Sequence, residues 1–300
     1  MVKNLLSGKG GGGKINATLT KAPGTDDAML FFCDVQKLKA MLTSKLQKEG
    51  EQETADKVKL ALERLGLDQL DSVVCRTGFL DLDMVMNSYI PTPAPHAGLP
   101  ACLKPISSSA WKMIPADVMA AIVCHIDPAG IYDTILHTLQ GLIEPDEYRV
   151  LQNNLTEAEA KVGIKIRDGF LEALDGQVVM YVGSPAPGLL SPVGNFIYMF
   201  KLKNTPLLKN NLASLENFIK GLITQGMVQI TSQEIEGESV RVAVVPFLAM
   251  MQMMPCWTVA EDQLIFASNT TACAAQLAAL KLKKPPGDRL SIGTSLRVVP

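Results

Sequence analysis

Two ten-residue segments repeat one pattern, and this repeat constrains the fold more than any other feature of the chain. DDAMLFFCDV (residues 26–35) and DVMAAIVCHI (residues 117–126) each run from an acidic residue through an apolar stretch to a cysteine at the same offset. Each is long enough for one buried β-strand. We therefore expect two related units that each begin with a strand. The side chains expected in the core are Phe31, Phe32, Ile122 and Val123.

Each repeated strand is followed by the same order of predicted elements, which is strand, helix, helix, strand, strand. In the second copy Asp127 can cap the first helix, and Pro128 suits its first position. In the first copy, the first helix is predicted from an apolar stripe, and it is followed by a helix at 53–65 and strands at 72–80 and 83–90. The stripe consists of Leu38, Met41, Leu42 and Leu46. The second copy has a helix at 144–161 and strands at 177–184 and 194–202 after its first helix. The apolar stripe of that first helix consists of Ile131, Ile135, Leu139 and Leu142.

The second copy continues with a further helix and two strand pairs. A helix begins at Thr205–Pro206, and strands at 227–235 and 239–245 flank a turn at Glu236–Glu238. The segment CWTVAEDQLIFAS (residues 256–268) predicts a second hairpin that turns at Glu261–Asp262, with a helix at 270–280 after it. Short turns between strands favour antiparallel pairing. The expected class is α+β, with mainly antiparallel twisted sheets and helices on one face.

The predicted organisation has four parts. Residues 1–24 are expected to be a flexible Gly-rich tail, 25–110 the first α+β unit, and 111–283 the second, larger unit. Residues 284–300 are expected to be a tail or the start of a truncated third unit. The reason is that SLRVVP at 295–300 is similar to SAWKMIP at 109–115, which precedes the second repeat.

Composition excludes several classes of function. The chain has 300 residues, of which 47% are hydrophobic and 19% charged, so it can bury one large core or two ordinary ones. Its net charge of −2, with lysines and arginines scattered, argues against a nucleic-acid partner. No apolar run approaches the ~18 residues of a membrane span. MVKNLLSG lacks the apolar core of a signal peptide, so we expect either a cytoplasmic protein or an export signal outside this chain.

The segment SGKGGGGK, Ser7 to Lys14, matches the spacing of a phosphate-binding loop. Ile15 stands where a serine or threonine hydroxyl would hold Mg²⁺, and the flanking residues predict neither the strand before such a loop nor the helix after it. We favour a flexible linker over an ATPase site, and no cofactor is expected. ATP with Mg²⁺ should accordingly bind negligibly.

Residues with catalytic or metal-binding chemistry form no recognisable motif. His96, His125 and His137 lack metal-ligand spacing, and the six cysteines contain no C-x-x-C. Buried free thiols are favoured over disulfides, and Cys33 and Cys124 are expected on central strands, buried and not paired with each other. The acidic pairs Asp26–Asp27, Asp81/Asp83 and Glu236/Glu238 are expected at strand ends or turns. No catalytic or metal residue is predicted.

One segment has an unusual composition, PFLAMMQMMPCW at residues 246–257. Pro246 and Pro255 should keep the flanking strands from running through it. Met side chains either fill gaps in the protein's own core or form an adaptable docking surface for an apolar partner. We favour the core cap and keep the docking surface as the alternative. The candidate docking residues are Phe247, Leu248, Met250, Met251, Met253, Met254 and Trp257.

Four segments carry a resemblance to a known family: LGLDQLDSVV, IPADV, DGFLEALDGQVVMYVG and CWTVAEDQLIFASN. Together they resemble a family of uncharacterised bacterial exported proteins, a domain of unknown function built of repeated "Pro-Ala-Asp then apolar strand" α+β units. The resemblance covers most of residues 23–283. It implies an exported, periplasmic or cell-envelope protein, and it brings no catalytic residue with it.

These observations leave three classes of function. The leading prediction is a non-enzymatic cell-envelope binding or scaffold module that contacts another envelope protein or an apolar ligand. The second is a hydrolase with a dispersed Asp, Glu and His site. The third is an ATPase that uses Ser7 to Lys14. A pocket lined by convergent acidic or histidine side chains would favour the enzyme, and exposed apolar surface would favour binding.

Overall fold

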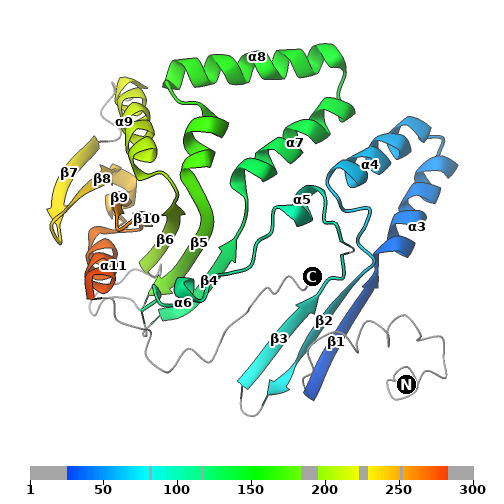
Figure 1. Cartoon of the computed structure of the whole chain (residues 1–300), viewed down its shortest axis with the longest axis horizontal. Coiled ribbons are helices and arrows are strands. Elements are labelled where there is room, and N and C mark those ends of the chain that lie inside the picture. Colours follow the sequence, from blue (N-terminus) through cyan, green and yellow to red (C-terminus); the bar gives the residue numbers. More distant parts are fainter. Residues whose placement is uncertain are drawn as a thin grey trace. The chain divides into compact units, whose positions relative to one another are not determined.

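The strands predicted from the sequence form two antiparallel sheets in the computed structural model (Figure 1). The structure describes residues 26–80, 83–92, 94–115, 118–183, 195–222, 229–250 and 253–282. The α+β class and the antiparallel pairing are therefore confirmed. The expectations for Ser7–Lys14 and for residues 284–300 lie outside the described residues.

The chain divides into two compact units. Unit 1 comprises residues 1–102, 133–145 and 291–300, and unit 2 comprises residues 103–132 and 146–290. Helix α7 (Pro128–Leu142) begins in unit 2, and its residues from Asp133 onward group with unit 1. The predicted division of the chain between residues 110 and 111 remains a proposal.

Unit 1 contains a three-stranded sheet and two successive helices. The elements are β1 (Asp26–Asp34), α3 (Val35–Lys48), α4 (Gln52–Arg64), β2 (Ser72–Leu80), β3 (Asp83–Tyr89) and the short α5 (Gly98–Ala101). Asp34 ends β1 and caps α3, because its Oδ1 accepts a hydrogen bond from the Lys37 amide at 3.0 Å. The sheet order is β1-β2-β3. The predicted order of elements in the first copy is thus confirmed.

Unit 2 contains a seven-stranded sheet. Its strands are β4 (Val118–His125), β5 (Leu174–Gly183), β6 (Asn195–Leu202), β7 (Gln229–Ile235), β8 (Glu238–Val244), β9 (Cys256–Ala260) and β10 (Gln263–Ala267). Its helices are α6 (Ser108–Trp111), α8 (Pro145–Val162), α9 (Thr205–Leu222), α10 (Pro246–Met250) and α11 (Thr270–Leu282). A π-helical turn (Ile166–Phe170) and a 3₁₀ turn (Leu171–Ala173) precede β5.

The large sheet runs in the order β4-β5-β6-β10-β9-β8-β7, and every neighbouring pair is antiparallel. Both predicted hairpin turns are confirmed. Glu236 and Gly237 join β7 to β8, and Glu261 and Asp262 join β9 to β10, all four with positive φ. This is the geometry of a two-residue turn whose twist matches that of its strands. The orders β1-β2-β3 and β4-β5-β6 are alike, and their origin from one repeated unit stays a prediction.

Helices cover both faces of the large sheet. Ile265 belongs to one buried cluster, which includes Leu277 of α11, and its neighbour Leu264 belongs to a second, which includes Leu208 of α9. Because successive side chains of a strand point to opposite faces, α11 and α9 lie on opposite faces. The sequence predicted helices on one face only. The apolar stripe of α9 shows that this helix packs against the sheet, but it does not show on which face.

Two of the four predicted core residues are not in the core. Val123 is buried and Phe32 half-buried, whereas Phe31 is 55% and Ile122 60% exposed. Phe32 shares a face with the buried Val74, its cross-strand partner, and Phe31 points to the opposite face. Ile122 likewise points away from the face that Val123 packs on. An apolar run identifies a strand but does not show which of its faces is covered.

The prediction that Cys33 and Cys124 lie buried on central strands is wrong. Cys33 is on β1 and Cys124 on β4, which are edge strands of their sheets in the described part of the chain, and both thiols are half-buried. Strand order places them there, since each unit adds its later strands on one side of the first. The two thiols are free, as predicted.

Candidate functional site

The loop between β8 and β9 is the segment whose composition predicted either a core cap or a docking surface. β8 ends at Val244 and β9 begins at Cys256, so the predicted interruption of both strands is confirmed. Pro246 occupies the first position of α10, where its fixed φ suits a helix and its missing N–H costs no hydrogen bond. The two strands are neighbours in the sheet, and Val242 pairs with Cys256.

Three backbone hydrogen bonds hold this loop in a defined shape. The Ala243 amide donates to Pro255 O at 2.8 Å across the base of the loop. Within the loop, the Ala249 amide donates to Val245 O at 2.8 Å, and the Met253 amide donates to Leu248 O at 2.9 Å. The described residues of the loop are therefore anchored at its base, in α10 and at Met253.

The side chains of the loop separate into an inward and an outward group. Met254 packs against the core cluster that includes Ile265, whereas Phe247 is 69% and Met250 85% exposed. These two residues are spaced i, i+3 on α10 and therefore share one side of that helix. Three further candidates, Leu248, Met253 and Trp257, are half-buried, and Met251 lies outside the described residues. The segment thus combines a core anchor with an exposed apolar pair, which we call the Phe247–Met250 pair.

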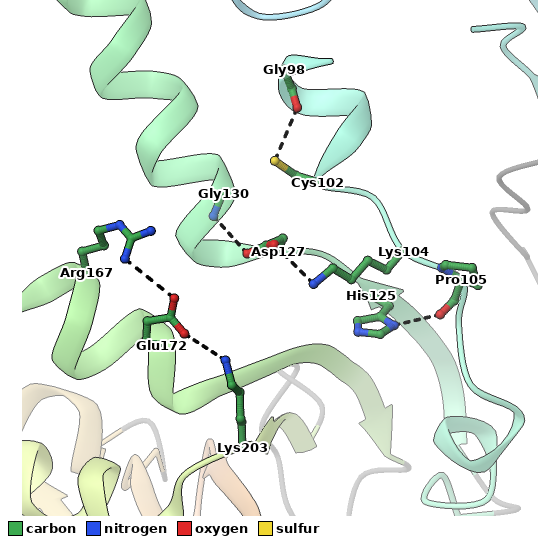
Figure 2. Close-up of polar contacts among 10 residues, drawn as sticks. All are labelled: Gly98, Cys102, Lys104, Pro105, His125, Asp127, Gly130, Arg167, Glu172 and Lys203. Atoms are coloured by element: carbon green, nitrogen blue, oxygen red, sulfur yellow. Dashed lines mark hydrogen bonds and ion pairs between the residues drawn. The ribbon is translucent and has the colours of Figure 1, made fainter. Parts of the chain in front are cut away.

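A polar cluster lies where β4 meets α7 in unit 2 (Figure 2). Asp127 caps α7 by accepting a hydrogen bond from the Gly130 amide at 3.0 Å, and its other oxygen lies 3.3 Å from Lys104 Nζ. The predicted cap is confirmed. This amide and Lys104 hold the pKa of Asp127 below its ordinary value, the amide being the larger cause. His125 is fixed by a 2.8 Å hydrogen bond between its Nδ1 and Pro105 O.

A second set of charges in unit 2 completes this cluster. Glu172 lies between two cations, 3.7 Å from Arg167 and 2.9 Å from Lys203 (Figure 2). Glu172 raises the pKa of Lys203, and Asp127 contributes to the same effect. Arg167 also lies 2.8 Å from Asp168, so three carboxylates balance the three cations of the cluster. We interpret it as an element that fixes the start of α7 rather than as a ligand site.

The cap predicts how stability depends on pH. Because the pKa of Asp127 is lowered on folding, its contribution is present above the unfolded value near ~4 and is lost as pH falls through the lower folded value. We expect Asp127→Ala to cost about 1 kcal/mol at pH 7 and Asp127→Asn to cost less. Urea midpoints between about pH 2 and 6 should show a shallower acid loss for Asp127→Asn than for the wild type. Equal acid slopes would contradict this assignment.

Other residues with catalytic or metal-binding chemistry are not assembled into a metal site. No group of three His, Cys, Asp or Glu side chains suited to a metal occurs among the described residues. His137 is exposed on α7; Glu236 lies in the β7–β8 turn and Glu238 begins β8, as predicted. Asp26–Asp27 and Asp83 begin strands, also as predicted, and Asp81 is not described. Every helix within the described ranges falls short of the length and apolar character that a membrane crossing requires.

A hollow in unit 1 was not predicted from the sequence. It has a volume of about 750 Å³ and is open to solvent. Gln36 donates hydrogen bonds to Asp68 O at 2.9 Å and to Leu70 O at 2.8 Å, which holds the 68–71 loop against the start of α3. The only sign of this hollow in the sequence is the polar character of two separate loops. Nothing in the spacing of these loops predicts that they lie side by side. The lining residues are Gln36, Asp68, Gln69, Asp71, Ala94, Pro95, His96 and Ala97.

Comparison of the chain with protein-family models, with curated proteins and with solved structures finds no match. The family resemblance and the functions that it implies therefore stay predictions.

Proposed function

We propose that this protein is a non-enzymatic binding module of the cell envelope that docks another protein through the Phe247–Met250 pair. One observation carries the proposal. These are the two most exposed large apolar side chains in the described part of the chain. Burying either side chain against a partner would contribute about 1.5–3 kcal/mol to the free energy of binding. Exposed to water, neither side chain stabilises the fold. The cell-envelope location rests on the sequence resemblance alone.

The way the loop is built favours a docking role. Its base is closed by the bond between Ala243 and Pro255, and Met254 holds it to the core. Because these contacts already hold the described residues of the loop, those residues lose little conformational freedom when a partner binds. Met254 fits the core-cap interpretation because it packs on the core. The Phe247–Met250 pair does not fit it, because both side chains are exposed.

The exposed pair favours a protein partner over a small apolar ligand. Small ligands bind in cavities that enclose most of their surface. Phe247 and Met250 project from a short surface helix, and such projecting apolar side chains serve as anchors that enter a pocket on a partner. Met adapts to pockets of different shape, which suits this position.

The test compares an outward with an inward substitution. The double variant Phe247→Ser/Met250→Ser should unfold within about 2 °C of the wild type, since neither side chain is buried. Met254→Ser should instead lower the unfolding free energy by about 1–3 kcal/mol. A photo-crosslinking residue at position 250, introduced in the producing cell, should capture a discrete protein. The matched control places it at Val150, another exposed apolar position, in α8.

Two results would contradict the docking role. The first is a double variant that is destabilised as much as Met254→Ser, which would make the outward pair part of the core. The second is a stable double variant, with a probe at position 250 that captures nothing beyond what the probe at position 150 captures.

A hydrolase is the second candidate, because the hollow of unit 1 brings His96 together with Asp68 and Asp71. A histidine and carboxylates in one hollow have the chemistry of general acid–base catalysis. Assays with chromogenic ester and glycoside substrates test it. Turnover that is lost in both His96→Ala and Asp71→Asn, while both variants keep the wild-type unfolding midpoint, would favour the hydrolase. The absence of turnover in the wild type would leave the binding module.

A further inference from the structure

Two free thiols meet in the core of unit 2. Cys256 begins β9, where it pairs with Val242 on one side and Ala267 on the other. Cys273 lies in the first turn of α11, which packs on the same face of the sheet. Their exposed fractions are 1% and 0%, and their side chains are hydrogen-bonded to each other. The pair therefore links a strand of the sheet to the helix that covers it.

The two thiols are not equivalent. Cys256 donates its proton toward the Cys273 sulfur, so the pKa of Cys273 is lowered, while this bond and burial raise the pKa of Cys256. Cys273 also lies at the N-terminal end of α11, where the helix dipole favours a negative charge.

Other cysteines of the described chain have different neighbours. Cys124 on β4 lies opposite Val178. Cys102 donates a hydrogen bond to the Gly98 carbonyl at 3.4 Å. Both thiols lie in other parts of the fold, and Cys124 supplies a matched control.

We propose that Cys256 and Cys273 form a disulfide with a small disulfide as oxidant, and that this bond fastens α11 to β9. The thiolate of one cysteine of the pair attacks one sulfur of the oxidant, which forms a mixed disulfide and releases one oxidant thiolate. The thiolate of the other cysteine then attacks the protein sulfur of that mixed disulfide and releases the second oxidant thiolate. Two protons leave the pair, and two electrons reduce the oxidant to two thiols.

Burial determines when this exchange takes place. Both sulfurs are closed to solvent in the folded unit, so the oxidant reaches them before α11 docks or while it is locally detached. The bond closes a loop of about 17 residues that contains the β9–β10 hairpin, and the closed loop restricts the unfolded chain. We expect the oxidised protein to unfold about 6–12 °C above the reduced protein.

The experiment uses the whole chain, unfolded and refolded with either oxidised glutathione or dithiothreitol. Free thiols are then alkylated in denaturant, and the protein is digested with trypsin. No Lys or Arg lies between residues 256 and 273, so both cysteines stay in one peptide. After oxidation that peptide should be two hydrogens lighter than the dithiol and should carry no alkyl group. After reduction it should carry two.

Variants separate the bond from other effects of oxidation. Cys256→Ser and Cys273→Ser should each lose the rise in unfolding temperature, and Cys124→Ser should keep it. Doubly alkylated peptide from the oxidised wild type would overturn the inference, and this measurement requires no variant to fold. An oxidised wild type that unfolds at the temperature of the reduced protein would also contradict it, as would a disulfide that joins either thiol to a different cysteine.

Discussion

Gly176→Ala is expected to destabilise unit 2 by about 3–5 kcal/mol, a larger effect than that of any surface substitution proposed above. Gly176 has a φ of +96°, a backbone conformation that residues with a Cβ rarely adopt. A Cβ built at this position would lie 1.8 Å from the Ile126 carbonyl oxygen. That oxygen belongs to backbone, so β4 and β5 would have to separate where the Ile126 amide donates to Gly176 O at 3.0 Å.

Gly221→Ala is the matched control for this substitution. Gly221 lies in α9, has no neighbouring atom within 4 Å of a built Cβ, and should gain about 0.5–1 kcal/mol from the better helix propensity of alanine. Urea unfolding followed by the fluorescence of Trp111 and Trp257, both in unit 2, measures both effects. A loss below about 1 kcal/mol for Gly176→Ala would show that the β4–β5 junction relaxes without strain.

The local elements could be predicted because their signals are local. Asp127 and Pro128 mark the start of α7 by their own chemistry. The turns at Glu236–Gly237 and Glu261–Asp262 are recognisable as short polar breaks between β-rich segments. Each of these features depends on residues a few positions apart, and the sequence contains all of them.

Strand order could not be predicted, because it depends on contacts between distant segments. β10 lies between β6 and β9, and nothing in the composition of QLIFA distinguishes that place from an edge. The same limit explains Cys124 and Ile122. Both were expected to be buried because their segment is apolar, but they lie on the face of β4 opposite the buried Val123, and an apolar segment does not show which face is covered.

The candidate site was predictable as a segment but not as a surface. Its methionines and its bracketing prolines identified an unusual loop, and two interpretations remained open. Which side chains face outward depends on how α10 sits on the sheet, so composition alone could not separate Met254 from the Phe247–Met250 pair. The structure shows Met254 packed on the core and Phe247 and Met250 exposed, and the crosslinking experiment decides whether the outward pair has a partner.

The second large effect is expected for a polar residue in the core. Gln276 on α11 is fully buried. Its Oε1 accepts a hydrogen bond from the Tyr181 hydroxyl, and its Nε2 donates to Met113 O at 3.4 Å and to the Met199 sulfur at 3.0 Å. Gln276→Ala removes these bonds and leaves a cavity, so we expect it to lower the unfolding free energy by about 3–4 kcal/mol.

A double-mutant cycle separates the hydrogen bond from the packing. Tyr181→Phe should cost about 1–2 kcal/mol because Gln276 loses its donor, and Gln276→Met should cost about 2 kcal/mol because Tyr181 loses this acceptor. The double variant Tyr181→Phe/Gln276→Met replaces both partners with apolar groups of similar size. It should therefore cost less than the two single variants together, by about 1 kcal/mol or more. Additive losses in urea unfolding would mean that the two side chains do not depend on each other, and that Gln276 holds α11 through Met113 and Met199 instead.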